Sequence, residues 1–214
     1  MVEAQHTAST MKILDNAAEQ DILESLLEGS KPVLPANAFG LDYLLATPFR
    51  YYPTATGSRF RAPTDPGVFY AAQSVHTASA ELGYWRWKFL KDAVDLERLE
   101  PVAHTAFSAE LSTSIVDLRL APFINGADKW THPNDYRATQ AFAREARQAG
   151  VGAIQYQSVR SPHPAWCIAL LIPQAFSKPK PNPIMQTWWL AVYPDGIHWR
   201  CDSESYTFTT AAWM

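Results

Sequence analysis

The sequence predicts a single α+β domain with a mixed, mostly antiparallel central sheet flanked by helices. Helical and strand-like segments alternate along the chain without the regular βαβ rhythm of a doubly wound sheet. Pro194-Asp195-Gly196, between two strand-like runs, is typical of a β-hairpin turn. With 214 residues, 47% of them hydrophobic, the chain is long enough to bury one sizeable core.

Residues 1–40 are acidic, and we expect them to form a helical arm before a catalytic domain at 41–214. Gly29 suits the end of a helix, and the prolines that follow prevent its continuation. The pattern favours a helix that packs on its own domain over one that binds a partner or a membrane surface. Four apolar residues recur at every fourth position: Leu14, Ala18, Ile22 and Leu26.

The segment 47–90 combines a turn, a strand and a helix. Pro66-Gly67 marks the turn, residues 68–71 are strand-like, and the period becomes helical from Ser74. Glu81 lies at the edge of the apolar stripe of this helix, where its carboxylate can be half buried and still reach a cleft. The stripe comprises Val75, Ala78, Leu82, Trp85 and Phe89.

The remaining chain supplies the other strands and one more helix. Asn134 or Asp135 can cap a helix that ends at Gly150. Strand-like character is found at 102–109, 114–118, 151–159, 165–172, 187–193 and 197–200.

Composition excludes several classes of function. A net charge of −3 and a pI near 6.1 disfavour nucleic acid as the main ligand. The chain has no run of about 18 apolar residues and no secretion signal at its start, so we expect a cytoplasmic protein without membrane contact. Cys167 and Cys201 form no CxxC motif, and we expect both to be buried, reduced thiols.

Standard catalytic motifs are missing from the sequence. There is no P-loop, no GxSxG nucleophile elbow and no HExxH pair, so we expect neither a metal centre nor a bound cofactor. The stretch Gly150-Val151-Gly152-Ala153-Ile154-Gln155 lacks the last glycine of a dinucleotide-binding loop and precedes a strand.

One cluster in the segment 47–90 suggests a chemistry. Arg50 and Arg59 offer planar forks of donors that match a diphosphate or free phosphate. Tyr51 and Tyr70 offer ring faces for stacking a flat ring and hydroxyls as polar handles. Glu81 can stabilise an oxocarbenium-like transition state. These requirements converge on NAD as the substrate, because its nicotinamide leaves as a neutral molecule without a partnering acid.

Three functions remain open at this point. The ribosyl cation can be captured by water or phosphate, which makes an NAD glycohydrolase or phosphorylase. It can be captured by a protein side chain, which makes an ADP-ribosyltransferase. A module that binds a nucleotide or ADP-ribose without turnover is the third possibility.

The order of the residues in this cluster resembles the RES-domain family, over roughly residues 48–199. That family is named after an arginine, a glutamate and a serine, which correspond to Arg50 or Arg59, Glu81 and Ser158. The matching stretches are Phe49-Arg50-Tyr51, Gly57-Ser58-Arg59-Phe60, Gly67-Val68-Phe69-Tyr70, Ala78-Ser79-Ala80-Glu81 and Tyr156-Gln157-Ser158-Val159-Arg160.

The resemblance implies a toxin of a bacterial toxin–antitoxin pair that destroys NAD, on a fold related to ADP-ribosyltransferases. It implies that the arginines hold the diphosphate or an incoming phosphate and that Glu81 stabilises the ribosyl cation. Ser158 would bond the nicotinamide amide or the phosphate. The expected partners are NAD, a cognate antitoxin and possible further copies of the chain.

The chain departs from the family pattern in two places. Many members have a Gly-Gly-Arg-Trp-like turn where this chain has Gly57-Ser58-Arg59-Phe60. The acidic arm also extends beyond the compact family core, so the docking of an antitoxin does not transfer simply.

Overall fold

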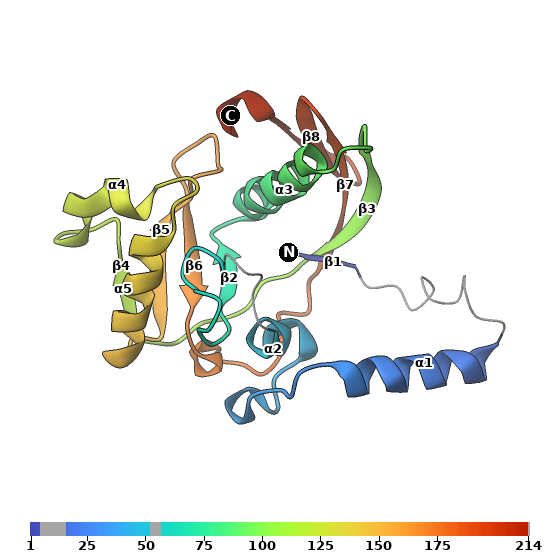
Figure 1. The fold of residues 1–214 in the computed structure, drawn as a ribbon, viewed down its shortest axis with the longest axis horizontal. Helices are drawn as coiled ribbons and strands as arrows, with labels where there is room; N and C mark the ends of the chain where they lie inside the picture. Colours follow the sequence, from blue (N-terminus) through green and yellow to red (C-terminus); the bar gives the residue numbers. More distant parts are fainter. Residues whose placement is uncertain (5–15, 52–56, 214) are drawn as a thin grey trace.

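The chain folds as a single α+β domain, which confirms the predicted class (Figure 1). A computed structural model describes residues 1–4, 16–51 and 57–213. The α-helices are α1 (Ala17–Ser30), α2 (Tyr43–Arg50), α3 (Val75–Asp92), α4 (Ala127–Trp130) and α5 (Arg137–Gln148). Short 3-10 helices lie at Ala36–Ala38, Phe123–Gly126, Pro173–Ala175 and Thr210–Trp213. The strands are β1 (Val2–Glu3), β2 (Phe69–Ala72), β3 (Leu99–Ala106), β4 (Ile115–Asp117), β5 (Ala153–Gln157), β6 (Trp166–Leu170), β7 (Gln186–Tyr193), β8 (Gly196–Cys201) and β9 (Glu204–Thr209).

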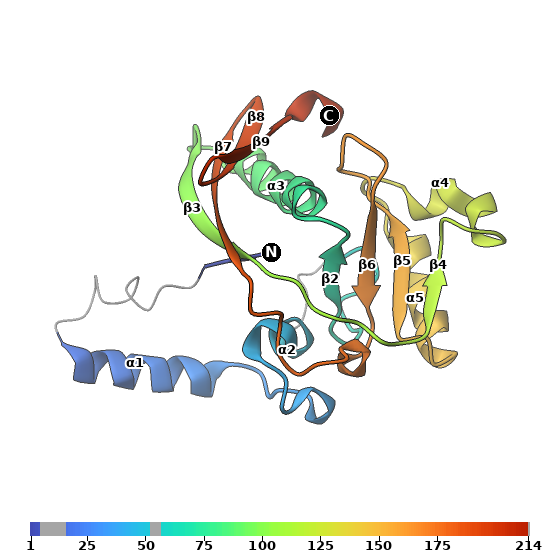
Figure 2. The same cartoon turned by 180° about the vertical axis from the view of Figure 1, so that it is seen from behind.

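These strands form two sheets, where the sequence predicted one central sheet. The five-stranded sheet has the order β1-β3-β7-β8-β9 and is antiparallel throughout. The four-stranded sheet has the order β2-β6-β5-β4, with only β4 and β5 parallel. The chain passes between the sheets after β1, β2, β3 and β6, and Figure 2 shows α3, which follows β2, between the two sheets. Residue periodicity identifies a strand but not its neighbours, so the split into two sheets is invisible in the sequence.

Helix α3 joins the two sheets, and it packs with a different face from the predicted one. Ser74 caps its start by accepting a bond from the backbone N–H of Thr77. The buried face includes Ala80, Gly83 and Trp87, and a Cβ on Gly83 would lie 1.8 Å from Cδ1 of Ile197 on β8. Small residues therefore allow the close approach of the helix to the sheet. Of the predicted apolar stripe, Val75 and Leu82 pack at the margin of the core and also line the cleft, whereas Trp85 and Phe89 are 48% and 55% exposed.

The predicted hairpin is confirmed, and other element boundaries shift. Strands β7 and β8 pair up to Tyr193 and Gly196, which flank a two-residue turn. Strand β5 ends at Gln157, so Ser158 lies just beyond the strand on which it was predicted. Helix α5 begins at Arg137, later than predicted, and its N-cap makes no side-chain bond.

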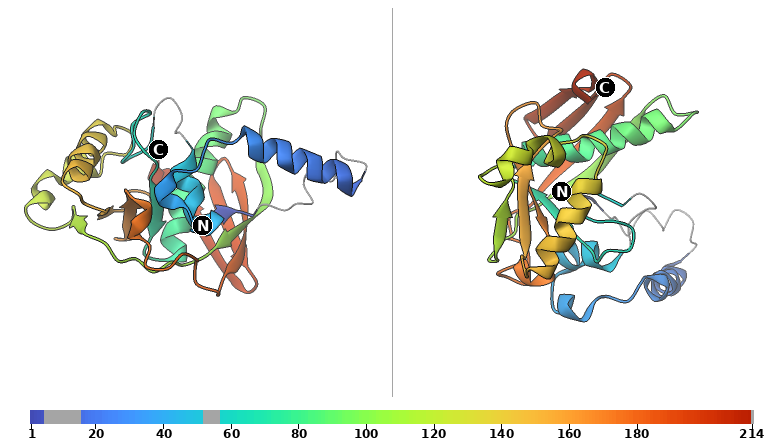
Figure 3. Two further views of the ribbon diagram at one scale, coloured as in Figure 1. Left: turned by 90° about the horizontal axis from the view of Figure 1, so that it is seen from below. Right: turned by 60° about the vertical axis from the view of Figure 1, so that its left-hand side comes forward.

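The arm does not pack on the domain as the sequence pattern favoured. In α1 only Gln20 is buried, whereas Ile22 and Leu26 are 60% and 67% exposed. Figure 3 shows α1 projecting from the body of the molecule. Leu14, the first residue of the predicted stripe, lies outside the described residues. Among the described residues, no helix has the length and apolar character needed to cross a bilayer.

His104 on β3 generates a prediction about stability and pH. It is 1% exposed, Nδ1 lies 2.9 Å from the carbonyl oxygen of Val102, and its ring meets Trp199 edge-on. Burial lowers the pKa of His104. The unfolded chain therefore binds this proton more readily, and the free energy of unfolding falls as the pH drops below about 6.5, until the lower native pKa is reached.

We expect the wild-type protein to lose stability relative to a His104→Phe variant when the pH is lowered from 8 to 5. Urea unfolding of both proteins at each pH measures this difference, and the other histidines cancel because both proteins share them. A difference that does not depend on pH would contradict a neutral, buried His104.

Candidate active site

A cleft of about 880 Å³ lies between the two sheets. Strand β2 and the first turns of α3 form one wall, β6 and the end of β3 contribute others, and the segment before β2 closes one end. Its polar lining residues include Arg59, Tyr70, Glu81, Tyr136 and Arg160. The sequence predicted Arg59, Tyr70 and Glu81 as site residues. Tyr136 and Arg160 come from two other segments of the chain.

Glu81 projects from α3 and is held by residues of the four-stranded sheet. Ser158 Oγ donates a hydrogen bond to Glu81 Oε1 at 2.5 Å, and Cys167 Sγ lies 3.8 Å from the same oxygen. Ser158 is only 5% exposed, and its Oγ accepts bonds from the backbone N–H groups of Arg160 and Ser161. With Oγ fixed as an acceptor from the backbone, the hydroxyl hydrogen points to Glu81. The geometry therefore makes Ser158 a residue that orients the carboxylate.

Two buried arginines donate hydrogen bonds to backbone carbonyl oxygens of one loop, residues 130–136, beside the cleft. Arg59 is 8% exposed, and its Nη1 donates to the carbonyl oxygens of Trp130 and His132, both at 3.0 Å. Arg160 is 4% exposed, and its Nη2 donates to the carbonyl oxygen of Pro133 at 2.5 Å. Both guanidinium groups thus line the cleft with part of their donors occupied and their positions fixed.

Aromatic rings also contact the guanidinium groups of these two arginines. The guanidinium of Arg59 lies 4.8 Å from the ring centre of Tyr136, and that of Arg160 lies 3.4 Å from the ring centre of Tyr84. Tyr84 also donates from its hydroxyl to Asn134 Oδ1 at 3.2 Å, so α3 is tied to the same loop. Cation–π contact is stronger where water is excluded, as it is for both buried side chains.

Tyr70 lines the cleft, and its hydroxyl bonds to residues of the preceding turn. The hydroxyl accepts from the backbone N–H of Phe60 at 2.9 Å and lies 2.8 Å from Ser58 Oγ. Burial raises the pKa of Tyr70, and its bond to Ser58 acts in the opposite direction. Ser58 stands where many family members have the second glycine of the turn, and its hydroxyl contacts the hydroxyl of Tyr70. Gly57 has a φ of +71°, and a Cβ there would lie 2.2 Å from the carbonyl oxygen of Arg61, so glycine is required.

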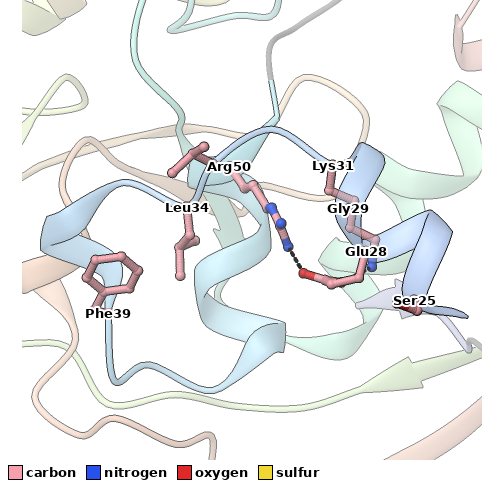
Figure 4. Close-up of a pocket in the computed structure, with 8 residues that line it drawn as sticks. Ser25, Glu28, Gly29, Lys31, Leu34, Phe39 and Arg50 are labelled. Carbon is pink, nitrogen blue, oxygen red and sulfur yellow. Dashed lines mark hydrogen bonds and ion pairs between the residues drawn. The ribbon is translucent and has the colours of Figure 1, made fainter.

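The structure does not bring Arg50 or Tyr51 to this cleft. Arg50 is the last residue of α2, and its Nη1 donates to Glu28 Oε1 at 2.7 Å (Figure 4). Its Nε donates to the carbonyl oxygen of Pro32 at 2.5 Å. Tyr51 is 40% exposed and accepts a bond from Arg61 at its carbonyl oxygen. The predicted set thus divides into Arg59, Tyr70, Glu81 and Ser158 at the cleft, and Arg50 and Tyr51 outside it.

Sequence reasoning assigned no role to Arg160, Cys167 or Tyr136. Arg160 stands two residues after Ser158 in the stretch that carried the resemblance, so its position was a usable signal. Cys167 is a buried free thiol, as expected, but its place beside Glu81 was not foreseen. Cys201 is also a free thiol but is only partly buried, because it ends the strand β8 next to a turn. Within the described residues, no three His, Cys, Asp or Glu side chains are grouped to hold a metal ion. The charges of the site instead suit an anionic ligand next to a developing cation.

The contact between Glu81 and Cys167 can be tested through the reactivity of the thiol. Burial raises the pKa of Cys167, and the negative charge of Glu81 raises it further. Because the thiolate is the reactive form, removing that charge should speed alkylation. In a Cys201→Ser background, we expect Glu81→Gln to react faster with iodoacetamide at pH 8 than the protein that retains Glu81. Equal rates, measured by intact mass, would contradict the electrostatic contact, and Glu145→Gln on the exposed side of α5 is the charge-matched control.

The chain matches the family model of the RES domain over residues 34–192. This range contains Glu81, Ser158 and both arginines of the cleft, and every residue of the predicted set. No curated protein sequence matches the chain. Because the match covers well over half of the chain, the protein belongs to the RES domain family.

Proposed function

We propose that this protein cleaves the bond between nicotinamide and ribose in NAD, with water or phosphate as the acceptor, and so acts as an NAD-depleting toxin. Membership of the RES domain family is consistent with a toxin-like function that involves NAD. We further expect a cognate antitoxin as a protein partner.

The observation that carries the proposal is the Glu81 carboxylate, oriented by the 2.5 Å bond from Ser158 and placed in one cleft with two arginine side chains. When the glycosidic bond of NAD breaks, positive charge develops on the ribose ring, and a fixed carboxylate stabilises it. Arg59 and Arg160 provide a positive surface for the diphosphate of the same molecule.

The proposed reaction balances with either acceptor. The electrons of the glycosidic bond leave with neutral nicotinamide, and the anomeric carbon becomes the electrophile. Water then gives ADP-ribose and one proton, whereas inorganic phosphate gives ADP-ribose phosphorylated at the anomeric carbon. Capture by a protein side chain would instead make a transferase.

A site that only binds a nucleotide gains little from this carboxylate. A negative charge next to a diphosphate weakens binding, unless it acts on a positive charge that appears during the reaction. The position of Glu81 in the same cleft as both arginines therefore favours turnover over binding alone.

We expect purified protein to release nicotinamide from NAD and Glu81→Gln to do so about 100- to 1,000-fold more slowly with an unchanged fold, as for the loss of a main electrostatic group. Mass spectrometry with and without phosphate identifies the product as ADP-ribose, its phosphorylated form or a mass shift on protein. Glu145→Gln should retain full activity. No release of nicotinamide by the wild-type protein, or equal release by Glu81→Gln, would overturn the proposal.

Arg160 inside the cleft and Arg50 outside it, which the sequence predicted as an anion ligand, can be separated by the KM values of their variants for NAD. Arg160→Ala should raise KM by about tenfold or more, because losing a hydrogen bond to a charged group costs roughly 1.5–3 kcal/mol. Arg50→Ala should change KM by no more than about threefold, since it removes a partly exposed ion pair outside the cleft. Melting curves of Arg160→Ala and the wild-type protein show whether the loss of the bond from Arg160 to the 130–136 loop destabilises the fold. A larger effect from Arg50→Ala would place the diphosphate near α2.

A further inference from the structure

The short helix Thr210–Trp213 places an indole ring against the turn that follows β5. Trp213 Nε1 donates a hydrogen bond to the carbonyl oxygen of Arg160 at 3.0 Å. Arg160 is one of the two buried arginines of the cleft, whereas Trp213 is not among the described residues that line it. Figure 1 shows this segment, at the red end of the colour bar, next to the loop between β5 and β6. Trp213 therefore contacts a cleft residue from outside the cleft.

The five-stranded sheet fixes the position of this segment. Thr210 is 3% exposed, and its backbone N–H and hydroxyl donate to carbonyl oxygens of the β7–β8 turn, at 3.2 Å to Asp195 and 3.3 Å to Pro194. The Trp213 ring stacks near Phe208 of β9, with ring centres 6.3 Å apart and planes inclined by 22°. The indole N–H is therefore held at a defined position on this sheet.

The same indole ring also contacts the aromatic partner of the Arg160 guanidinium. Trp213 meets Tyr84 edge-on, with ring centres 5.7 Å apart and an interplanar angle of 87°. The centre of the Tyr84 ring in turn lies 3.4 Å from the guanidinium carbon of Arg160. Trp213 therefore supports Arg160 at two points, the backbone carbonyl oxygen directly and the guanidinium through Tyr84.

The turn that Trp213 contacts also carries the serine of the site. The backbone N–H groups of Arg160 and Ser161 donate to Ser158 Oγ at 3.4 Å and 3.2 Å. The carbonyl group of Arg160 and the N–H of Ser161 belong to one planar peptide unit. This unit accepts a bond from Trp213 and donates one to Ser158, so the indole restrains the backbone on which Arg160 stands.

We propose that Trp213 is a positioning residue that holds Arg160 in place for the diphosphate of the substrate. The inference rests on the proposed function, since Arg160 is taken to bind the anionic part of NAD. The family match ends at residue 192 and does not supply this contact. An arginine whose backbone and side chain are both restrained loses less conformational entropy when it binds an anion. Loss of the bond from Trp213 should therefore weaken binding of the anion and leave the chemical step nearly unchanged.

The test uses Trp213→Phe, which keeps an aromatic ring near Tyr84 but removes the indole N–H. Trp87→Phe is the matched control, because Trp87 belongs to the same aromatic cluster, is 6% exposed and donates from Nε1 to the carbonyl oxygen of Pro194 at 3.0 Å. If general destabilisation weakened binding, this control should weaken it as much. Calorimetry measures the Kd for ADP-ribose, a probe that carries the diphosphate and requires no turnover, and steady-state kinetics gives KM and kcat for NAD.

We expect Trp213→Phe to raise the Kd for ADP-ribose and the KM for NAD by about fivefold, the effect of one ordinary hydrogen bond, with kcat changed by less than about twofold. The amides of Arg160 and Ser161 should exchange hydrogen faster than in the wild-type protein. Trp87→Phe should bind ADP-ribose as the wild type does. In an Arg160→Ala background, Trp213→Phe should have no further effect on Kd or KM, because it acts through Arg160.

Three results would overturn the role of Trp213: unchanged Kd and amide exchange in Trp213→Phe, an equal loss of affinity in Trp87→Phe, or a loss that adds to that of Arg160→Ala. Failure of the wild-type protein to bind ADP-ribose would overturn it as well. If the wild-type protein binds ADP-ribose but releases no nicotinamide, only the proposed reaction fails, and the Kd values and amide exchange still decide the role of Trp213.

Discussion

The close packing of α3 on the five-stranded sheet is the constraint on which the cleft depends. Gly83 leaves no room for a side chain against Ile197, so the helix sits at a fixed depth. Strand β2, directly before α3, belongs to the other sheet. The two sheets are therefore related through one strand–helix unit, and Glu81 lies where that unit crosses from one sheet to the other. The bond from Ser158 then joins the carboxylate to the four-stranded sheet.

The apolar stripe predicted on α3 is covered only in part. The helix buries Ala80, Gly83 and Trp87, whereas Val75, Leu82 and Trp85 line the cleft. Glu81 therefore shares the cleft with apolar side chains and with two buried arginines. Such a setting strengthens electrostatic interactions relative to water, in keeping with the proposed stabilisation of a ribosyl cation.

Local signals in the sequence were sufficient for the elements and for part of the site. The capping Ser74 and the Pro194-Asp195-Gly196 turn act through neighbouring residues, so α3 and the β7–β8 hairpin could be predicted. The ordered residues Arg59, Tyr70 and Glu81 also line one cleft.

The errors concern contacts between residues distant in the chain. The buried face of α3 was missed because the helix carries a second apolar row with helical spacing, Ala80, Tyr84, Trp87 and Leu90, and periodicity alone does not choose between two such rows. The position of Arg50 depends on Glu28, 22 residues away on the arm, and that of Arg160 depends on Tyr84 on another element. No periodicity records such pairs, and the division into two sheets was hidden for the same reason.

The hydrogen bonds of Arg59 and Arg160 to the 130–136 loop have a consequence for selectivity among anionic ligands. A free arginine side chain gives up about 2 kcal/mol of rotamer entropy when it is ordered. Arg59 and Arg160 lose this entropy when the chain folds, because their bonds to carbonyl oxygens and their contacts with tyrosine rings already order both side chains. An incoming anion therefore meets donors whose spacing is already set. Its shape, and not its charge alone, decides how many of those donors it can reach at once.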